Sequence, residues 1–172
     1  MVDKRSLLLG AGHSRQKKVA LSSAPDWLGT LTTLDISLRC GSDVVWDLEC
    51  RPLPFPDATF DELAAYDVLE HIGRQGDWRG WFDEMAEYHR ILKPGGRFGI
   101  IVPIGGDAFA DPGHTRFFSA NYFGFLNQEF YRSNLEIGNP VTDYRWYWKL
   151  NFDFVFIETC ENHHIAVLLQ KT

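Results

Sequence analysis

The sequence predicts an α/β fold with an open, mostly parallel sheet and helices on both faces. Residues 6–12, S-L-L-L-G-A-G, give the first indication, because three consecutive leucines require an inner strand that is covered on both sides. The turn at Gly10 and Gly12 is the second, since a strand followed by G-x-G is typical of a nucleotide-binding corner. The third is a pair of strand patterns, residues 151–159 and 164–170, which indicates a final antiparallel hairpin.

The segment after the glycine turn is expected to be largely irregular. Residues 13–18 are polar and begin either a helix or an irregular turn, and residues 19–29 contain Pro25 and Gly29, which break regular structure. Residues 31–36, L-T-T-L-D-I, predict the second strand because they are rich in β-branched residues. The next three strands are expected at residues 43–46, 61–66 and 97–102.

The clearest helix is expected at residues 77–92. Its apolar and aromatic residues recur at helical spacing and define one buried face. Asp77 is a suitable N-cap, and the sequence K-P-G-G at residues 93–96 is typical of a helix end. Residues 51–57 contain three prolines at alternate positions, which exclude a helix or an inner strand and predict a fixed extended loop.

The last part of the chain predicts one more helix and the final hairpin. Ser119 can cap a helix that continues to about Phe130. The two hairpin strands are expected to be joined by a tight turn at residues 161–162. Phe152, Phe154 and Phe156 alternate along the first of these strands, which places them on one face of the sheet.

Composition limits the classes of function. The chain has 172 residues, and we expect one domain, residues 1–172, with a net charge of −6 that disfavours nucleic acid as a partner. Its cysteines, Cys40, Cys50 and Cys160, form no C-x-x-C pair and no metal-ligand spacing with histidine, so neither a metal site nor a disulfide framework is expected. No apolar run is long enough for a secretory signal or a membrane span. A cytoplasmic location is expected, and the oligomeric state stays open.

A carboxylate follows the second strand at the spacing that a ribose site requires. Asp35 lies 23 residues after Gly12, close to the spacing of about 20 residues at which a strand-end acid accepts hydrogen bonds from a ribose diol. The alternative is a solvated turn aspartate, which is common after any strand. Because the glycine turn accompanies it, we favour the ribose.

Taken together, the motifs resemble those of class I S-adenosylmethionine-dependent methyltransferases, in particular a small bacterial and phage-type branch related to methyltransferase type 11. The similarity rests on the order L-L-L-G-A-G, L-D-I, D-V-V-W-D-L, P-L-P-F-P-D-A-T-F-D-E-L, D-V-L-E-H-I and I-L-K-P-G-G-R-F-G-I-I-V-P, and covers roughly residues 6–130. A later segment, D-P-G-H-T-R-F-F, is similar to a D-P-x-H-x-R-F-F segment of that branch. The resemblance implies a Rossmann-like sheet of seven strands with the last one antiparallel, and S-adenosylmethionine as the cofactor.

The resemblance also implies roles for individual residues. Asp35 would hold the ribose hydroxyls, Asp47 would accept from the adenine amino group, and the Leu48 amide would meet a ring nitrogen. Asp67 and its neighbours would line the methionine end of the cofactor. The implied cofactor-binding set is Gly10, Ala11, Gly12, Asp35, Ile36, Asp47, Leu48 and Asp67.

Two positions depart from related patterns. A third glycine of G-x-G-x-x-G would fall at position 15, where the chain has Arg15, and this argues against NAD or FAD. The methyltransferase family usually has an acid two residues before the first glycine, and here that residue is Leu8. Leu8 motivates an alternative function, a non-catalytic or degenerate binding module that keeps the fold.

Methyl transfer requires an aligned acceptor whose proton is removed. Two histidines are candidates for this step. His114 lies in a loop that could cover the acceptor and is the preferred one, whereas His71 follows a strand end and could simply bond to backbone. The expected acceptor is an oxygen or nitrogen atom of a small polar molecule, a metabolite or a glycan. Asp111 and Arg116 either anchor that substrate or hold the loop in place.

Overall fold

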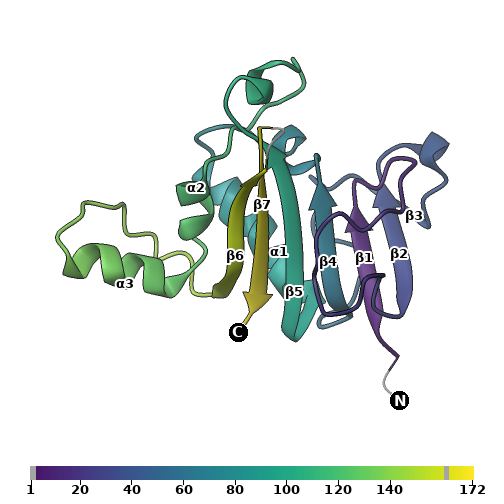
Figure 1. Cartoon of the computed structure of the whole chain (residues 1–172), viewed down its shortest axis with the longest axis horizontal. Coiled ribbons are helices and arrows are strands. Elements are labelled where there is room, and N and C mark those ends of the chain that lie inside the picture. The colour runs from purple at the N-terminus through teal and green to yellow at the C-terminus, as the bar shows by residue number, and fades with distance from the viewer. Residues whose placement is uncertain (1–2, 161–162) are drawn as a thin grey trace.

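A seven-stranded sheet organises the computed structural model, which describes residues 3–160 and 163–172. The strand order is β3-β2-β1-β4-β5-β7-β6 (Figure 1). The strands are β1 Arg5–Leu9, β2 Thr30–Asp35, β3 Val44–Val45, β4 Phe60–Tyr66, β5 Leu92–Pro103, β6 Phe152–Cys160 and β7 His164–Lys171. Only β7 runs antiparallel to its neighbours, β5 and β6, so the predicted mixed sheet is confirmed. The turn predicted at residues 161–162 lies outside the described residues.

The inner position of β1 explains its run of leucines. β1 pairs in parallel with β2 on one side and with β4 on the other. Leu7 and Leu9 are fully buried on one face of the sheet, and Leu8 is buried on the opposite face with Val19 and Leu21. Successive side chains of a strand point to opposite faces, so a strand covered on both sides must be apolar at every position.

Three α-helices occur among the described residues. They are α1 Trp78–Ile91, α2 Ala120–Gly124 and α3 Gln128–Glu136. The Asp77 side chain caps α1 by accepting from the Gly80 amide, and the aromatic face of the helix packs on the main core, as predicted. The single helix expected from Ser119 is divided into α2 and α3, because the Asn127 side chain accepts from the Phe130 amide and starts a new helix there.

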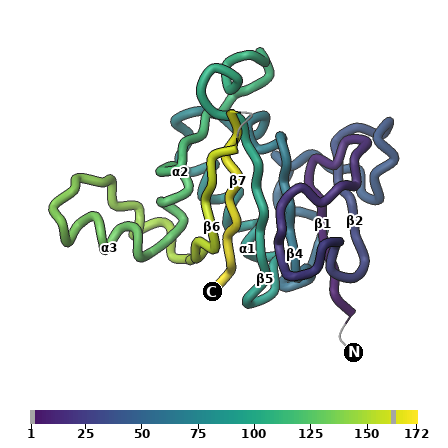
Figure 2. Tube along the Cα trace, in the orientation of Figure 1, coloured from purple at the N-terminus to yellow at the C-terminus, as the bar shows by residue number. Residues whose placement is uncertain are grey.

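Helix α1 covers one face of the sheet, and irregular chain covers the other (Figure 1). α1 lies behind the sheet in Figure 1, whereas the purple segment of residues 13–29 crosses in front of it (Figures 1 and 2). The expectation of helices on both faces is therefore wrong for this second face within the described residues. The irregular segment expected at residues 19–29 is confirmed, and of the two alternatives for residues 13–18 the structure shows the irregular one.

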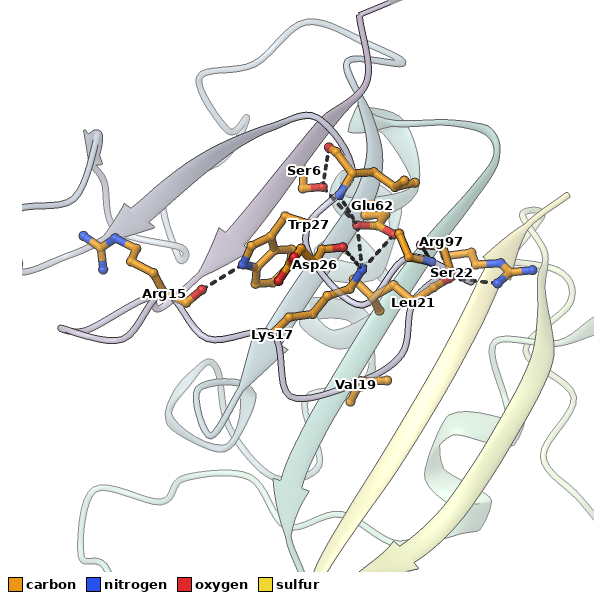
Figure 3. A network of polar contacts seen from close by, with 12 residues as sticks. Ser6, Arg15, Lys17, Val19, Leu21, Ser22, Asp26, Trp27, Glu62 and Arg97 are labelled. Carbon is orange, nitrogen blue, oxygen red and sulfur yellow. Dashed lines mark hydrogen bonds and ion pairs between the residues drawn. The ribbon is translucent and has the colours of Figure 1, made fainter.

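Polar contacts hold this irregular segment against the sheet (Figure 3). The Lys17 ammonium lies 3.2 Å from Glu62 Oε1, and both side chains are buried. Glu62 also accepts from the Ser6 hydroxyl and from the Leu28 amide. The Trp27 indole donates to the Arg15 carbonyl. These contacts satisfy some of the backbone groups that a helix would have paired within itself.

A bulge in β6 changes which faces its phenylalanines occupy. The register shifts between Phe154 and Phe156, where β6 pairs with β7. Phe152 and Phe154 pack on the main core, whereas Phe156 packs on the cluster of the opposite face. The prediction that all three share one face is wrong, because an extra residue in a strand reverses the facing of every residue after it.

Candidate active site

A bare glycine turn follows β1 and lies against the end of β2. Gly10 and Gly12 have φ angles of 57° and 51°, in the left-handed region that favours glycine. A Cβ on Gly10 would come within 2.3 Å of the Val68 side chain, whereas a Cβ on Gly12 would meet no protein atom within 4 Å. Gly10 is therefore required by packing, and Gly12 leaves open space at the turn.

Asp35 is directed at this turn from the end of β2. It is 9% exposed, and its Oδ2 accepts from the Gly12 amide at 2.8 Å while Oδ1 accepts from the Ser37 amide at 2.8 Å. The Ala11 amide donates to the Leu34 carbonyl at 3.0 Å, which fixes the turn beside the strand. Each carboxylate oxygen keeps a further lone pair, so Asp35 can accept from a ligand without losing its backbone bonds.

A cavity of about 420 Å³ opens beside the carboxylate, and we call it the corner cavity. Its lining residues are Gly10, Leu34, Asp35, Ile36, Trp46, Asp47, Leu48, Glu49, Val68, His71 and Ile72. Five residues of the implied cofactor-binding set line it: Gly10, Asp35, Ile36, Asp47 and Leu48. Ala11 and Gly12 belong to the adjoining turn and are not part of the lining. The cavity thus combines the three carboxylates of Asp35, Asp47 and Glu49 with apolar walls, a composition that suits a nucleoside.

Asp47 lines the corner cavity together with Asp35. Its Oδ1 accepts from the Glu49 amide at 2.9 Å, and its carbonyl accepts from the Cys50 amide, so a tight turn fixes its position. Asp67 lies elsewhere. It has a positive φ of 55° at the end of β4, binds Lys18 and His164 with its two oxygens, and lines the neighbouring cavity instead.

That neighbouring space, which we call the histidine cavity, is open and has a volume of about 520 Å³. It is lined by Asp67, Glu70, His71, Pro103, Asp107, Ala110, Asp111, Pro112, His114 and His164. Both predicted histidines, His71 and His114, are present, with their ring centroids 4.7 Å apart. His71 lines both cavities, so the two spaces adjoin at this side chain.

Glu70 is the buried acid of the histidine cavity. Its Oε1 lies 4.0 Å from His114 Nε2, and its side chain is 2% exposed. Burial, with a smaller effect of the nearby Asp67, raises the pKa of the Glu70 carboxyl. The side chains of Glu70, His71 and His114 form a single polar cluster.

The loop that carries His114 is fixed by a buried ion pair. Arg116 is fully buried, and its Nη1 lies 2.7 Å from Glu84 Oε2 in α1. The amides of Thr115 and Arg116 both donate to the Glu70 carbonyl, at 2.8 and 3.1 Å. Of the two roles expected for Arg116, substrate anchor or loop support, the structure shows loop support, and this support sets His114 beside Glu70.

The acceptors and bare backbone of the corner cavity suit S-adenosylmethionine better than a dinucleotide. A pyrophosphate needs the N-terminus of a helix after the glycine turn, and the described residues 13–29 contain no helix. Arg15 replaces the third glycine and donates to the carbonyls of Gly12 and Gly41, which ties the turn to the loop after β2. A ligand with a ribose and an adenine but no phosphate needs only acceptors and bare backbone, which this corner supplies.

Comparison with known families agrees with this geometry. The family model described as "Methyltransferase domain" matches residues 9–100, more than half of the chain. The chain belongs to this methyltransferase domain family. The matched residues include the glycine turn, the strand-end carboxylates and Glu70 with His71, so the family match and the corner cavity involve the same part of the methyltransferase domain.

A curated relative supports the same cofactor. A probable S-adenosylmethionine-dependent methyltransferase of Mycolicibacterium smegmatis is 34% identical over 70 residues, which cover 37% of this chain and 25% of that protein. The chain thus matches about a quarter of the length of this relative. The name of that relative states dependence on S-adenosylmethionine, a ligand that the composition of the corner cavity suits.

Solved structures show the same fold at low sequence identity. A SAM dependent methyltransferase from Archaeoglobus fulgidus is 15% identical, with a TM-score of 0.60 and coverage of 99% of this chain and 87% of that chain. An S-adenosylmethionine dependent methyltransferase from Mesorhizobium loti is 14% identical, with a TM-score of 0.58 and coverage of 98% and 91%. A chain from the complex that contains the Haloferax volcanii Trm112 methyltransferase activator is 16% identical, with a TM-score of 0.60 and coverage of 99% and 84%.

Three residues at the end of β4 were not singled out from the sequence. Val68 and Ile72 supply an apolar wall of the corner cavity, and Glu70 is the buried carboxylate of the histidine cavity. All three belong to the V-L-E-H-I motif, in which only His71 had been assigned a role. The available signal was an acid directly before a histidine where a parallel strand ends, since ligands bind at such ends.

Proposed function

We propose that this domain transfers a methyl group from S-adenosylmethionine to an oxygen or nitrogen atom of a small polar acceptor, a metabolite or a glycan. The observation that carries the proposal is that the corner cavity and the histidine cavity adjoin at His71. When bound, the sulfonium supplies the methyl group and keeps the electron pair of the broken S–C bond, while the acceptor forms the new bond and loses a proton. The protein aligns the two partners.

On the cofactor side, the proposed contacts follow from the lining of the corner cavity. Asp35 accepts from the two ribose hydroxyls, Asp47 accepts from the adenine amino group, and the Leu48 amide donates to a ring nitrogen. Gly10, Ala11 and Gly12 give close approach to the backbone, and Ile36 adds an apolar contact. Asp67, which lines the histidine cavity, would face the methionine end from the acceptor side.

On the acceptor side, His114 is proposed to assist removal of the acceptor proton, with His71 as the second candidate. Both line the histidine cavity, and His114 Nε2 lies 4.0 Å from Glu70 Oε1. The cavity is open and carries several acids, which supports a hydrated polar acceptor with hydroxyl or amino groups. Nucleic acid is disfavoured by the net charge of −6.

The alternative is a binding module without catalytic activity, and Leu8 is the observation that favours it. Leu8 is packed against Val19 and Leu21, so no carboxylate is offered where the family usually has an acid. Calorimetry with S-adenosylmethionine and S-adenosylhomocysteine tests both functions. Absence of binding at millimolar cofactor would contradict the enzyme, and binding without methyl transfer to any member of a panel of sugars, amines and hydroxy acids would support the module.

A substitution of the candidate histidine tests the acceptor side. His114→Ala should lower turnover and leave the dissociation constant for S-adenosylhomocysteine unchanged, because His114 does not line the corner cavity. An intact rate would remove His114 from the reaction. A parallel loss of rate and cofactor affinity would indicate a general disturbance of the fold rather than a role at the acceptor.

We further propose that residues 1–172 form one domain that works in the cytoplasm. Cys40, Cys50 and Cys160 are all free thiols, which is consistent with a reducing compartment. Among the described residues, no helix combines the length and the apolar character needed to cross a membrane.

A further inference from the structure

A carboxylate and two imidazoles meet in the histidine cavity. One potential ligand atom from each of Glu70, His71 and His114 lies within 4.8 Å of the other two. Glu70 and His71 belong to the 3-10 turn Leu69–His71 after β4, whereas His114 comes from the loop that Arg116 fixes. Because His114 comes from a segment far from Glu70 and His71 in the chain, their spacing gave no metal-ligand pattern.

Backbone carbonyls set both rings to the same tautomer. His71 Nδ1 lies 3.1 Å from the Gly113 carbonyl, and His114 Nδ1 lies 2.9 Å from the Ala108 carbonyl. A carbonyl oxygen can only accept, so we assign the ring hydrogen to Nδ1 in both residues, which leaves each Nε2 with a free lone pair. Histidines that bind metals are commonly oriented in this way by a backbone carbonyl.

The carboxylate of the cluster lacks a donor. Glu70 is 2% exposed, and its Oε2 has no hydrogen-bond partner among the described residues. A buried carboxylate oxygen without a partner is costly, and a cation next to it removes this cost. Asp107 and Asp111 line the same cavity, so the local potential also favours a cation.

We propose that Glu70, His71 and His114 bind a divalent transition-metal ion, with Zn²⁺ as the first candidate. Two imidazoles and one carboxylate are the ligand set that catalytic zinc sites use, and imidazole disfavours Mg²⁺ and Ca²⁺. Zinc–ligand distances of about 2.0–2.2 Å require the donors to approach one another by roughly 1 Å, which a small movement of exposed His71 allows. The remaining coordination position faces the open histidine cavity.

The use of this ion in the reaction rests on the proposed function. An acceptor hydroxyl that coordinates the ion has a lowered pKa, so its proton passes to water and its oxygen is held beside the corner cavity. His71 and His114 would then act as ligands, and the ion would take over the activation proposed above for His114, with His71 as the second candidate.

Metal binding can be measured without the cofactor. The protein, treated with EDTA and dialysed, is titrated calorimetrically with Zn²⁺ and separately with Mg²⁺, and the Co²⁺ form is examined by visible absorption. We expect one equivalent of Zn²⁺, no comparable Mg²⁺ binding, and Co²⁺ bands typical of nitrogen and oxygen ligands. Glu70→Gln, His71→Gln and His114→Gln should each weaken Zn²⁺ binding by at least tenfold.

The matched control is His164→Gln, a change to a histidine that lines the same cavity but is outside the cluster. It should keep the zinc affinity. Absence of stoichiometric binding, equal affinity in all variants, equal loss in His164→Gln, or Co²⁺ bands typical of thiolate would each overturn the proposal. His71→Gln alters an exposed side chain and so keeps the test valid if a buried variant does not fold. Binding of S-adenosylhomocysteine to the metal-free protein separately tests the corner cavity.

Discussion

The carboxylate of Asp35 is the side chain whose removal tests the cofactor site most directly. The substitution Asp35→Asn keeps the shape of the side chain but removes its charge and one acceptor oxygen. Hydrogen bonds to a charged group contribute about 1.5–3 kcal/mol. If one such bond to a ribose hydroxyl is lost, the dissociation constant for S-adenosylhomocysteine should rise about 10- to 150-fold. Isothermal titration calorimetry measures this constant.

The same substitution disturbs the protein itself, so a matched control is needed. Asp35 accepts from the amides of Gly12 and Ser37, and an amide side chain can keep only one of these bonds. Asp43→Asn is the control, because Asp43 also stabilises β2, by accepting from the amide and hydroxyl of Thr33, but does not line the corner cavity. Asp43→Asn should leave cofactor affinity unchanged. A folded Asp35→Asn variant that binds S-adenosylhomocysteine within twofold of the original protein would refute the ribose assignment.

Three further predictions concern stability, measured by urea unfolding. Gly10→Ala and Gly12→Ala should each lower the free energy of unfolding by about 1–2 kcal/mol, because alanine is strained in the left-handed region. Gly10→Ala should lower it by about 1–3 kcal/mol more, because its Cβ overlaps the Val68 side chain. Equal losses in the two variants would contradict this packing. Arg116→Met should lower the free energy of unfolding by about 3–5 kcal/mol, because it leaves the Glu84 carboxylate buried and unpaired. Adding Glu84→Leu should restore part of this loss. Additive losses in the double variant would argue against a stabilising ion pair. Burial lowers the pKa of His89 from 6.5 to about 4, so its folded form stays neutral while the unfolded form takes up a proton. The contribution of neutral His89 to the free energy of unfolding is therefore fully present above pH 6.5 and falls by up to about 3 kcal/mol towards pH 4. His89→Phe should reduce this loss.

The fold could be predicted well where the sequence pattern depends on burial alone. The leucines of β1 and the aromatic face of α1 indicated their positions because a covered strand and an amphipathic helix have distinct periodicities. The facing of Phe156 could not be predicted, since a bulge depends on the pairing of β6 with β7. The coil on the second face was partly predictable from Pro25, but the ion pair of Lys17 and Glu62 that holds it joins distant positions.

In the candidate site, too, some residues could be predicted from local spacing and others could not. Asp35 followed from its spacing to the glycine turn, because a strand and the turn beside it are linked by local chain geometry. Glu70 and His114 could not be connected from the sequence, since their proximity depends on a loop that Arg116 anchors to α1. Local signals therefore indicated the corner cavity, whereas the histidine cavity depends on tertiary contacts.

The buried ion pair of Arg116 and Glu84 links the stability of the fold to the chemistry proposed for the histidine cavity. Methyl transfer requires the acceptor atom and the methyl donor to be held about 3–3.5 Å apart and in line. Strand ends fix the position of the corner cavity. One wall of the histidine cavity is formed by a loop whose amides donate to the Glu70 carbonyl. Arg116 anchors that loop to α1, so a change at Arg116 should displace His114 from Glu70 while Asp35 keeps its bonds to the glycine turn. The proposed transfer should thus lose rate at Arg116→Met before it loses cofactor affinity.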